Sequence, residues 1–467
     1  MGTTQSKRWP YFCMVAVGVL ISTRDSSMIN VALPSIMRSF STSLAVGQLI
    51  VLVYLSVITS TLVLWGHLSD IFGKGKVYLF GVLIFAVAAS GSSIAATFPQ
   101  LVVMRCIQGV GAAMMMSSGP AIIKMVFPPN QLGRGLGLVG LATSCGLMSG
   151  PVISGLLIRH FSWRWVFLVT LPLSLSVYIL GHFYLGLDKD EKCLAAKRAY
   201  DWVGFALWAT AVLLFIVLIS SYEVMGSKMI GLNLFCLVSV IGLFSRYERH
   251  VPHPLLPYVL FQRRYFATAS ITAALSFTVL FMVILLMPFY LDYVLHLPAD
   301  RIGLLMLTLP SSLVIVSPAA GWIYDHIGAR LPATLGLGIS CFSILTMTGL
   351  HEETPIIAIV LALSALGAGQ ALFLSPNSAS ILAKVEERYI GVASGILATA
   401  RNLGMLIGAG LSGAFFSYVF AFLSGGRNLH GFQVSDVPEF LSALHWTFSL
   451  AAALSLAGCL ISALRDS

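Results

Sequence analysis

Charged residues are scarce in this sequence. Only 10% of the 467 residues are Asp, Glu, Lys or Arg, whereas 58% are apolar, and the mean hydropathy is +0.91. A soluble globule of this length needs more polar residues than these to cover its surface. The composition therefore excludes a water-soluble protein and indicates a chain that is embedded in a lipid bilayer.

Cysteine is sparse as well, and its spacing predicts no site. The seven cysteines are odd in number, and no C-x-x-C pair occurs. They predict neither a disulfide framework nor a metal site. The sequence also lacks a G-x-x-x-x-G-K-[ST] phosphate-binding loop, which argues against ATP as the energy source, and it offers no convergent nucleophile and base. We therefore expect no enzyme, no metal and no cofactor.

Long apolar segments are what the sequence has in abundance. A helix needs about 20 apolar residues to cross the roughly 30 Å hydrocarbon core of a bilayer. Fourteen segments meet this requirement, namely 10–36, 44–65, 77–97, 99–124, 132–158, 164–186, 202–221, 228–245, 266–292, 302–324, 331–350, 355–378, 391–418 and 440–463. Lipid cannot satisfy free backbone N–H and C=O groups, and the apolar runs are uninterrupted, so each segment is predicted to be a helix. The expected fold is all-α, a polytopic membrane protein with 14 transmembrane helices.

The Lys and Arg residues predict the orientation of the chain. An even number of spans places both termini on one side of the membrane. Most of the 27 basic residues, among them Lys192, Arg198 and Arg263, lie in loops on that side. Because cytoplasmic loops carry such an excess, both termini are predicted to be cytoplasmic. The bases are scattered along loops and do not form one stripe, so they do not predict a nucleic-acid partner.

A motif of two glycines around an aspartate, followed by a base, occurs after the second span and again after the tenth. Its members are Gly66, Asp70, Gly73 and Lys74 in the first copy and Gly321, Asp325, Gly328 and Arg330 in the second. A parallel repeat of six spans would separate equivalent loops by six spans, whereas eight separate them here, which indicates two inserted spans. We expect an N-terminal six-helix half over 1–187, a linker with two additional helices over 188–262, and a C-terminal six-helix half over 263–467.

Several further motifs occur in an order typical of one protein family. They are 25–34 in the first span, 66–76 after the second, Arg105-x-x-Gln108-Gly109 in the fourth, 146–155 in the fifth, and 163–167, 253–256 and 401–404 elsewhere. This set resembles the major facilitator superfamily, and most of all its fourteen-span drug:proton antiporters. The resemblance covers nearly the whole chain. It implies a secondary active transporter that uses a proton gradient as its energy source.

Two departures from the family pattern bear on substrate and coupling. Arg24 stands where the family usually has an apolar residue, and Asp292 stands where a Gln is expected. The fold that the resemblance implies is unaffected by either.

Three charged residues, Asp25, Arg105 and Arg401, fall well inside predicted spans. Charge is costly there and usually faces a cavity or a partner. Arg105 and Gln108 are three residues apart, so they share a helix face and can act together on a carboxylate or a ligand. We predict that Asp25 and Arg105 form the proton-coupling site, where protonation responds to hydration and to a nearby arginine. A purely structural ion pair is the alternative.

Other polar residues of the spans are candidates for the lining of a substrate cavity. The predicted cavity residues are Arg24, Asn30, Tyr54, Gln108, Asp292, Gln370, Asn377, Arg401 and Asn402. For any single one of them, an interhelical hydrogen bond is the alternative role. Three intramembrane arginines outnumber Asp25, the carboxylate that lies firmly within the spans, which favours neutral, zwitterionic or anionic amphipathic substrates over organic cations.

The repeated glycine–aspartate motif is the predicted gate. Its aspartate and base can form ion pairs and helix-end contacts in one conformation and release them in another. A capped turn with topology-setting bases is the alternative. In the fifth span, Gly150 lets a neighbouring helix approach closely and Pro151 permits a bend, so both are predicted gating residues.

These observations predict transport by alternating access, in which a cavity between the halves opens to one side and then to the other. The expected function is proton-coupled export of small amphipathic molecules by antiport. The alternative is a proton-coupled symporter that takes up a small organic solute. We expect a monomer in a cell membrane, a bacterial cytoplasmic membrane in particular, whose partners are the lipid bilayer, protons and a small-molecule substrate.

Overall fold

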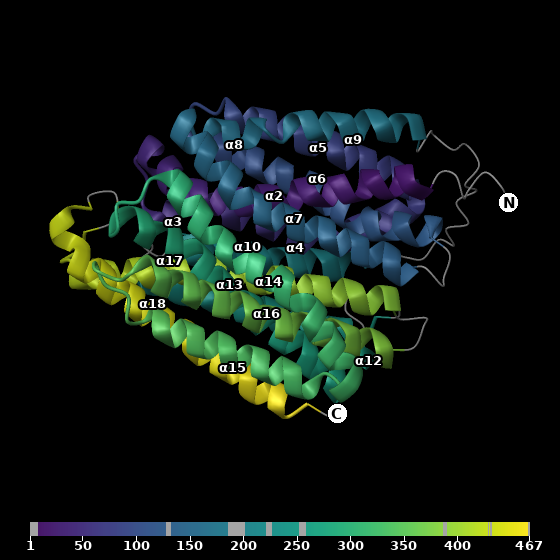
Figure 1. Ribbon diagram of the computed structural model, residues 1–467. Helices are drawn as coiled ribbons and strands as arrows, with labels where there is room; N and C mark the ends of the chain where they lie inside the picture. The colour runs from purple at the N-terminus through teal and green to yellow at the C-terminus, as the bar shows by residue number, and fades with distance from the viewer. Residues whose placement is uncertain are drawn as a thin grey trace.

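The computed structural model describes residues 8–127, 132–184, 201–220, 227–251, 258–385, 390–427, 429 and 432–465. This part of the chain is helical throughout its regular structure and contains no strand (Figure 1). The long helices are α2 (Arg8–Phe40), α4 (Leu49–Phe72), α5 (Lys74–Ser93), α6 (Phe98–Val126), α7 (Leu132–His160), α9 (Leu171–Tyr184), α10 (Trp202–Ser220), α11 (Ser227–Glu248), α13 (Arg264–Tyr293), α14 (Ala299–Ile327), α15 (Arg330–Met347), α16 (Ile356–Lys384), α17 (Ile390–Leu423) and α18 (Val437–Ala463).

The predicted all-α membrane fold is confirmed. Within the described residues, 13 helices are long and apolar enough to cross a membrane. The remaining predicted span, the fifth at 132–158, corresponds to α7, which packs between α2 and α14 inside the bundle. Apolar runs that lipid forces into helices therefore account for the architecture.

Two predicted spans are interrupted. The second contains a short helix, α3 (Leu44–Gly47), where the Ser43 side chain accepts a hydrogen bond from the Val46 N–H, before α4 begins. The sixth is divided into α8 (Arg164–Leu168) and α9. Hydropathy does not reveal these breaks, because the residues around them are as apolar as those of a continuous helix. The short helices α12 (Tyr258–Phe261) and η4 (Val434–Asp436) were not predicted either.

The internal repeat is visible in how glycines let helices cross. A Cβ on Gly111 of α6 would lie 2.7 Å from the Gly81 carbonyl oxygen of α5. In the second half, a Cβ on Gly369 of α16 would lie 2.6 Å from the Gly336 carbonyl oxygen of α15. Real Cβ atoms do not approach so closely, so both crossings require glycine. The same helix contact is thus made twice in the chain.

A second repeated contact joins α2 to α7 and α13 to α17. A Cβ on Gly146 of α7 would lie 2.7 Å from the Leu20 carbonyl oxygen, and one on Gly404 of α17 would lie 2.3 Å from the Ala274 carbonyl oxygen. One turn later, Gly150 and Gly408 repeat the contact on the next turn of α2 and α13. The small-residue face predicted for the fifth span therefore packs on α2, and we refer to α2–α9 and α13–α18 as the N-terminal and C-terminal halves.

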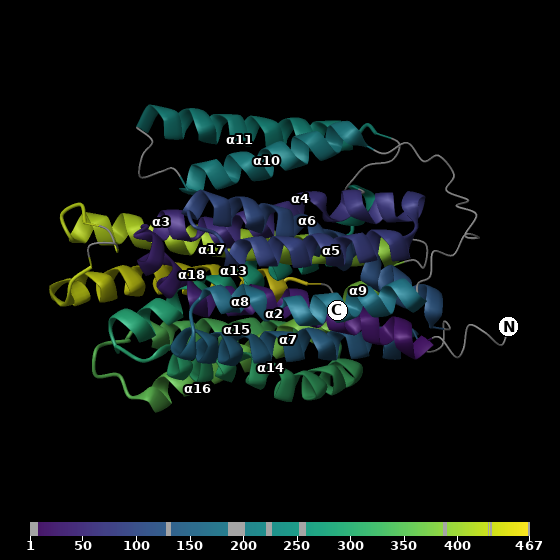
Figure 2. The same ribbon diagram turned by 90° about the horizontal axis from the view of Figure 1, so that it is seen from above.

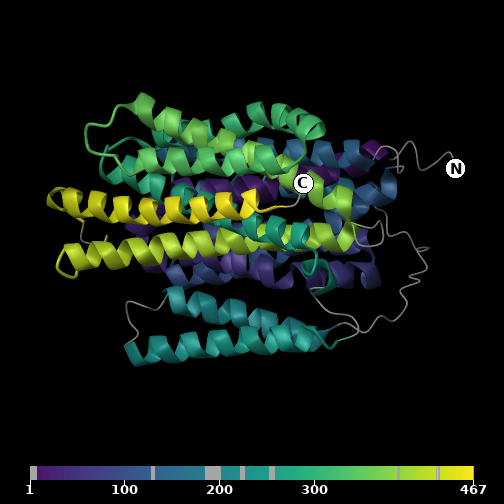
Figure 3. The same ribbon diagram turned by 90° about the horizontal axis from the view of Figure 1, so that it is seen from below.

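Helices α10 and α11 form a hairpin at one side of the bundle (Figure 2, Figure 3). Helix α10 packs on α4 and α17, one helix from each half, and α11 packs on α10. The predicted boundary at 187 lies outside the described residues, and the domain limits stay predictions.

Helix α2 begins and helix α18 ends toward the same end of the bundle, which we call the terminal end (Figure 1). The opposite end, where α2 and α13 finish at Phe40 and Tyr293, is the distal end. Which of them faces the cytoplasm stays a prediction.

Candidate functional site

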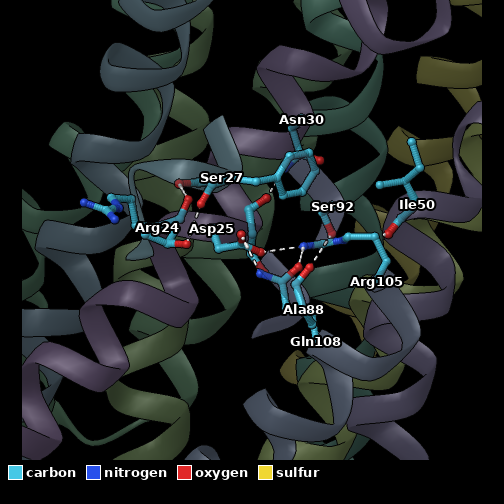
Figure 4. A network of polar contacts seen from close by, with 12 residues as sticks. Arg24, Asp25, Ser27, Asn30, Ile50, Ala88, Ser92, Arg105 and Gln108 are labelled. Atoms are coloured by element: carbon cyan, nitrogen blue, oxygen red, sulfur yellow. Dashed lines mark hydrogen bonds and ion pairs between the residues drawn. The ribbon is translucent and has the colours of Figure 1, made fainter. Parts of the chain in front are cut away.

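Asp25 of α2 lies at the centre of a closed polar cluster in the N-terminal half (Figure 4). Its Oδ2 accepts a hydrogen bond from Arg105 Nη1 at 2.6 Å, and its Oδ1 accepts one from Gln108 Nε2 at 3.0 Å. Arg105 Nη1 also donates to Gln108 Oε1 at 2.8 Å, and Arg105 Nε donates to the Ile50 carbonyl oxygen of α4 at 3.2 Å. Asp25, Arg105 and Gln108, which we call the Asp25 cluster, thus link three helices.

The cluster is closed off from solvent. Asp25 and Gln108 are 0% exposed and Arg105 is 1% exposed. The Tyr54 ring of α4 covers the guanidinium, with its centroid 4.1 Å from Arg105 Cζ. The predicted shared face of Arg105 and Gln108 is confirmed, because both side chains reach the same carboxylate from adjacent turns of α6.

This geometry fixes what the cluster can do chemically. Both Asp25 oxygens accept hydrogen bonds from donors, as an ionised carboxylate does. Removing either charge of a buried pair leaves the other uncompensated, which is strongly destabilising. A proton can bind Asp25 Oδ2 only in competition with Arg105. The ion pair between Asp25 and Arg105 therefore ties α2 to α6.

Arg24 does not belong to this cluster, although it is adjacent to Asp25 in the sequence. Its side chain points away from Asp25 (Figure 4), and its Nη2 donates to the Val169 carbonyl oxygen at the break between α8 and α9, at 3.2 Å. Its Nε is enclosed without a hydrogen-bond partner. Further along α2, Asn30 Nδ2 donates to the Ser26 carbonyl oxygen, whereas its Oδ1 has no partner.

Five of the predicted cavity residues lie in the C-terminal half, four of them on α16 and α17. Gln370 of α16 accepts a hydrogen bond from Ser276 Oγ of α13 at 2.7 Å. Arg401 of α17 donates from Nη2 to Ser378 Oγ of α16 at 2.6 Å. Asn402 is buried on the same helix as Arg401.

Asn377 has a structural position. Its Nδ2 donates to the Ala269 carbonyl oxygen of α13 at 3.1 Å, and its Oδ1 accepts from Arg465 Nη1 at 2.8 Å. Arg465 also donates to Ser380 Oγ, and burial lowers the pKa of its guanidinium to about 10. The Asn377 amide thus holds α13, α16 and the segment after α18 together.

Asp292 lies at the distal end rather than near Asp25. It forms an ion pair with Arg38, which joins the end of α13 to the end of α2. A second ion pair, between Arg159 and Asp300, joins α7 to α14. Both pairs cross between the halves, and sequence reasoning missed Arg38, Arg159 and Asp300. The sequence did contain a signal for these pairs. The two arginines and the two aspartates lie at ends of spans that are predicted to reach the same face of the membrane, and their charges are opposite.

An open cavity of about 540 Å³ adjoins the Arg38–Asp292 pair. Its lining residues are Arg38, Asp292, Tyr293, His296, Phe432 and Gln433. The cavity belongs to the distal surface and is separate from the Asp25 cluster.

Close packing accompanies the ion pairs at the distal end. A Cβ on Gly303 of α14 would lie 2.3 Å from the Pro151 carbonyl oxygen, and one on Gly155 would lie 2.4 Å from the Ala299 carbonyl oxygen. The Gln48 side chain lies against α17, where a Cβ on Gly413 would lie 1.6 Å from Gln48 Oε1. The halves are therefore in firm contact at the distal end, and the structure represents a distally closed conformation.

The predicted gating motifs form tight turns. Gly73 and Gly328 end α4 and α14 with φ of 97° and 75°, a backbone conformation that side chains other than glycine rarely adopt. At Gly66 and Gly321, an added Cβ would meet no atom within 4 Å. These motifs therefore make no close contact between halves at their glycines in this conformation.

The charged members of these motifs are placed differently. Arg330 Nε donates to the Ala463 carbonyl oxygen of α18 at 2.9 Å. Lys74 begins α5, and Asp325 is exposed near the end of α14. The Asp70 side chain lies outside the described residues. A gating role for the motif stays a prediction.

Two repeated helical halves that enclose buried charges define a polytopic membrane transporter. The family model described as Major Facilitator Superfamily matches residues 15–409 and 269–466. The chain belongs to this superfamily, as its motifs indicated.

Relatives of the chain cover nearly its whole length. The riboflavin transporter RibZ of Clostridioides difficile is 30% identical over 89% of this chain and 89% of its own. The tetracenomycin C resistance and export protein of Streptomyces glaucescens is 25% identical over 88% of this chain and 76% of its own. A crystal structure of a bacterial homologue of the human lysosomal transporter Spinster, in an inward-facing and unoccupied conformation, superposes with a TM-score of 0.68 over 98% of this chain and 97% of that one, at 14% identity.

Proposed function

We propose that this transporter exports small amphipathic molecules in exchange for protons, and that Asp25 carries the coupled proton. The observation that carries the proposal is the Asp25 cluster. Asp25 is 0% exposed and is held by Arg105 and Gln108 inside a membrane span. Burying a carboxylate there costs free energy, so such a residue usually has a functional role.

The cluster offers a physical route from proton binding to helix movement. Protonating Asp25 Oδ2 removes the charge that Arg105 Nη1 contacts at 2.6 Å. Arg105 also holds α4 through the Ile50 carbonyl oxygen, so its release loosens α2, α4 and α6 together. These helices meet the C-terminal half through α13 and α17. Protonation in the core thereby favours a different arrangement of the two halves.

Export is the direction that the similarity to a resistance and export protein supports. The riboflavin transporter among the relatives leaves uptake as the outcome to be tested. Flux into everted membrane vesicles that acidify their lumen, measured against right-side-out vesicles, separates the two directions. The orientation that this requires is set by labelling cysteines introduced at Arg263 and Gly425, which we expect to react only from the cytoplasm and only from outside, respectively.

The decisive experiment concerns Asp25→Asn in proteoliposomes. We expect this variant to lose substrate accumulation driven by a pH gradient while it retains substrate counterflow, because exchange needs the movement of the halves but not the proton cycle. Asp25→Glu should keep partial activity with a shifted pH optimum.

Ser154→Ala is the matched control. It removes a buried hydrogen bond of 2.9 Å from α7 to the Met28 carbonyl oxygen of α2 without changing a charge. It should therefore keep coupled transport. Accumulation by Asp25→Asn against a gradient would place the coupling proton elsewhere.

A further inference from the structure

We infer that Arg401 recognises an acidic group of the cargo, so that the substrate is an amphipathic organic anion bearing a carboxylate or a sulfonate. The inference rests on the proposed transport of small amphipathic molecules and specifies their chemical class. It assigns substrate charge to the C-terminal half and proton coupling to the N-terminal half.

The guanidinium of Arg401 is poorly satisfied by the protein. Its Nη2 donates to Ser378 Oγ at 2.6 Å, whereas its Nε is enclosed and has no hydrogen-bond partner. In the described part of the chain, no carboxylate lies within ion-pair distance of it. Arginine presents five donors in a planar fork that matches a carboxylate or sulfonate. A bound acidic group would supply the missing charge and the missing acceptors.

The other buried arginines of the described chain differ from Arg401 in this respect. Arg105 has Asp25 as its counter-charge, together with Gln108 and a backbone carbonyl group. Arg465 has two side-chain acceptors in Asn377 and Ser380 and lies beyond the end of α18. Arg24 is 4% exposed, whereas the Arg401 side chain keeps partial exposure. Arg401 is therefore the arginine best placed to receive a ligand.

The balance of charge within the spans also disfavours a cationic cargo. Both oxygens of Asp25 accept hydrogen bonds from Arg105 and Gln108, so this carboxylate is not available to a substrate in the described conformation. Asp292 is paired with Arg38 at the distal end. An organic cation near Arg401 would meet uncompensated positive charge, and an anion would meet attraction.

The surroundings of Arg401 suit an acid with an apolar body. The ring of Phe277 on α13 lies with its centroid 5.9 Å from Arg401 Cζ. Helix α17 approaches α13 closely at Gly404, where a Cβ would lie 3.0 Å from Phe277 Cβ. Arginine stacks readily on aromatic faces, so the ring and the guanidinium together form one surface with an apolar and a charged part.

The experiment compares matched probes on purified full-length protein in lipid nanodiscs. The probes are 2-naphthoate, 2-naphthalenesulfonate and 2-naphthyltrimethylammonium, with binding measured by calorimetry and flux measured in proteoliposomes under a pH gradient. We expect the wild type to bind the two acids more tightly than the cation. Arg401→Gln should weaken acid binding tenfold or more, while Arg263→Gln, which alters an exposed arginine before α13, should leave it unchanged.

Two further variants separate recognition from folding. Ser378→Ala removes the hydroxyl that Arg401 contacts and should retain acid binding. Arg401→Lys keeps the charge without the planar fork and should bind the acids at least threefold more weakly than the wild type; it decides the matter if Arg401→Gln does not fold. The inference is overturned if neither acid binds, if the cation binds as tightly as the acids, or if the Arg401 variants bind the acids like the wild type. Gradient-driven export of a cation would overturn this inference alone, whereas acid binding without any response of flux to the pH gradient would overturn the proposed function alone.

Discussion

The two halves make the same helix contacts around cores of different chemistry. Gly146 of α7 contacts Leu20 as Gly404 of α17 contacts Ala274, so Asp25 corresponds to Val279. Gly111 of α6 and Gly369 of α16 make equivalent crossings. When α6 and α16 are aligned on these two glycines, Arg105 and Gln108 correspond to two leucines of α16. These counterparts of the Asp25 cluster are Val279, Leu363 and Leu366, exposed by 1%, 0% and 0%.

This comparison separates two requirements on the sequence. Glycines at helix crossings are needed wherever backbones approach closely, so they occur in both halves. Buried charge is not needed for the fold, because the C-terminal half packs the same positions with aliphatic side chains. The C-terminal half thus makes the same helix contacts without these charges, which supports the proposed functional role of the Asp25 cluster.

The largest change in stability should come from replacing one member of the Asp25 cluster by the residue that occupies the equivalent position in the C-terminal half. Arg105→Leu leaves Asp25 buried without its counter-charge and should lower the free energy of unfolding by about 3–5 kcal/mol. Thermal unfolding in detergent measures this. The triple variant Asp25→Val, Arg105→Leu, Gln108→Leu copies the C-terminal half and should regain most of that stability without gradient-driven transport. A triple variant as unstable as Arg105→Leu would show that the cores are not interchangeable.

The glycine crossings should respond equally in the two halves. Gly111→Ala and Gly369→Ala each place a Cβ 2.6–2.7 Å from a backbone carbonyl oxygen. Backbone cannot move aside cheaply, so each variant should lose about 1–3 kcal/mol of stability. Gly395→Ala, in open space on α17, is the control and should be neutral or slightly stabilising. A large loss for one crossing and none for the other would contradict the repeat of packing.

The smallest effect is expected at the distal ion pairs, which are partly exposed. Combining Asp292→Asn with Asp300→Asn removes both cross-half attractions and should raise the reactivity of a cysteine at Gln48 toward a membrane-impermeant maleimide roughly two- to fivefold. Gln48 is 0% exposed in the closed arrangement, so labelling reports opening. A variant with the charges exchanged, Arg38→Asp together with Asp292→Arg, restores an ion pair at this position. In this variant the cysteine at Gln48 should react with the maleimide as slowly as it does in the otherwise wild-type protein. Unchanged reactivity in the double variant would mean that packing alone closes this end.

The sequence predicted the helical architecture because hydropathy and the glycine–aspartate repeat are local signals. It also predicted that Arg105 and Gln108 act together, since their spacing fixes a shared face. It placed Asp25 with Arg105, but it left open whether Arg105 and Gln108 act together on a carboxylate or on a ligand, because the rotation of each helix about its axis is set by packing. Gln370 and Asn377 make the interhelical hydrogen bonds that were the alternative for cavity residues.

The pairing of Arg38 with Asp292 shows the same limit. Each residue follows a helix-internal proline, Pro34 or Pro288, by four positions, so the two lie at matching places in the two halves. That correspondence can be read from the chain once the repeat is aligned. The contact between them follows only when the distal ends of the halves meet.

The hairpin of α10 and α11 has a mechanical consequence for any rocking movement of the halves. Trp208 Nε1 donates to the Thr59 carbonyl oxygen of α4 at 3.1 Å, which ties α10 to the N-terminal half. Toward the C-terminal half, Ile219 rests on Gly410 of α17, where a Cβ would lie 2.4 Å from Ile219 Cδ1. The contact with α17 is apolar and contains no hydrogen bond at Gly410, whereas the contact with α4 includes one. Helix α10 can therefore move together with α4 and slide along α17. Because α10 contacts both helices, it spans the seam between the two halves at this side of the bundle.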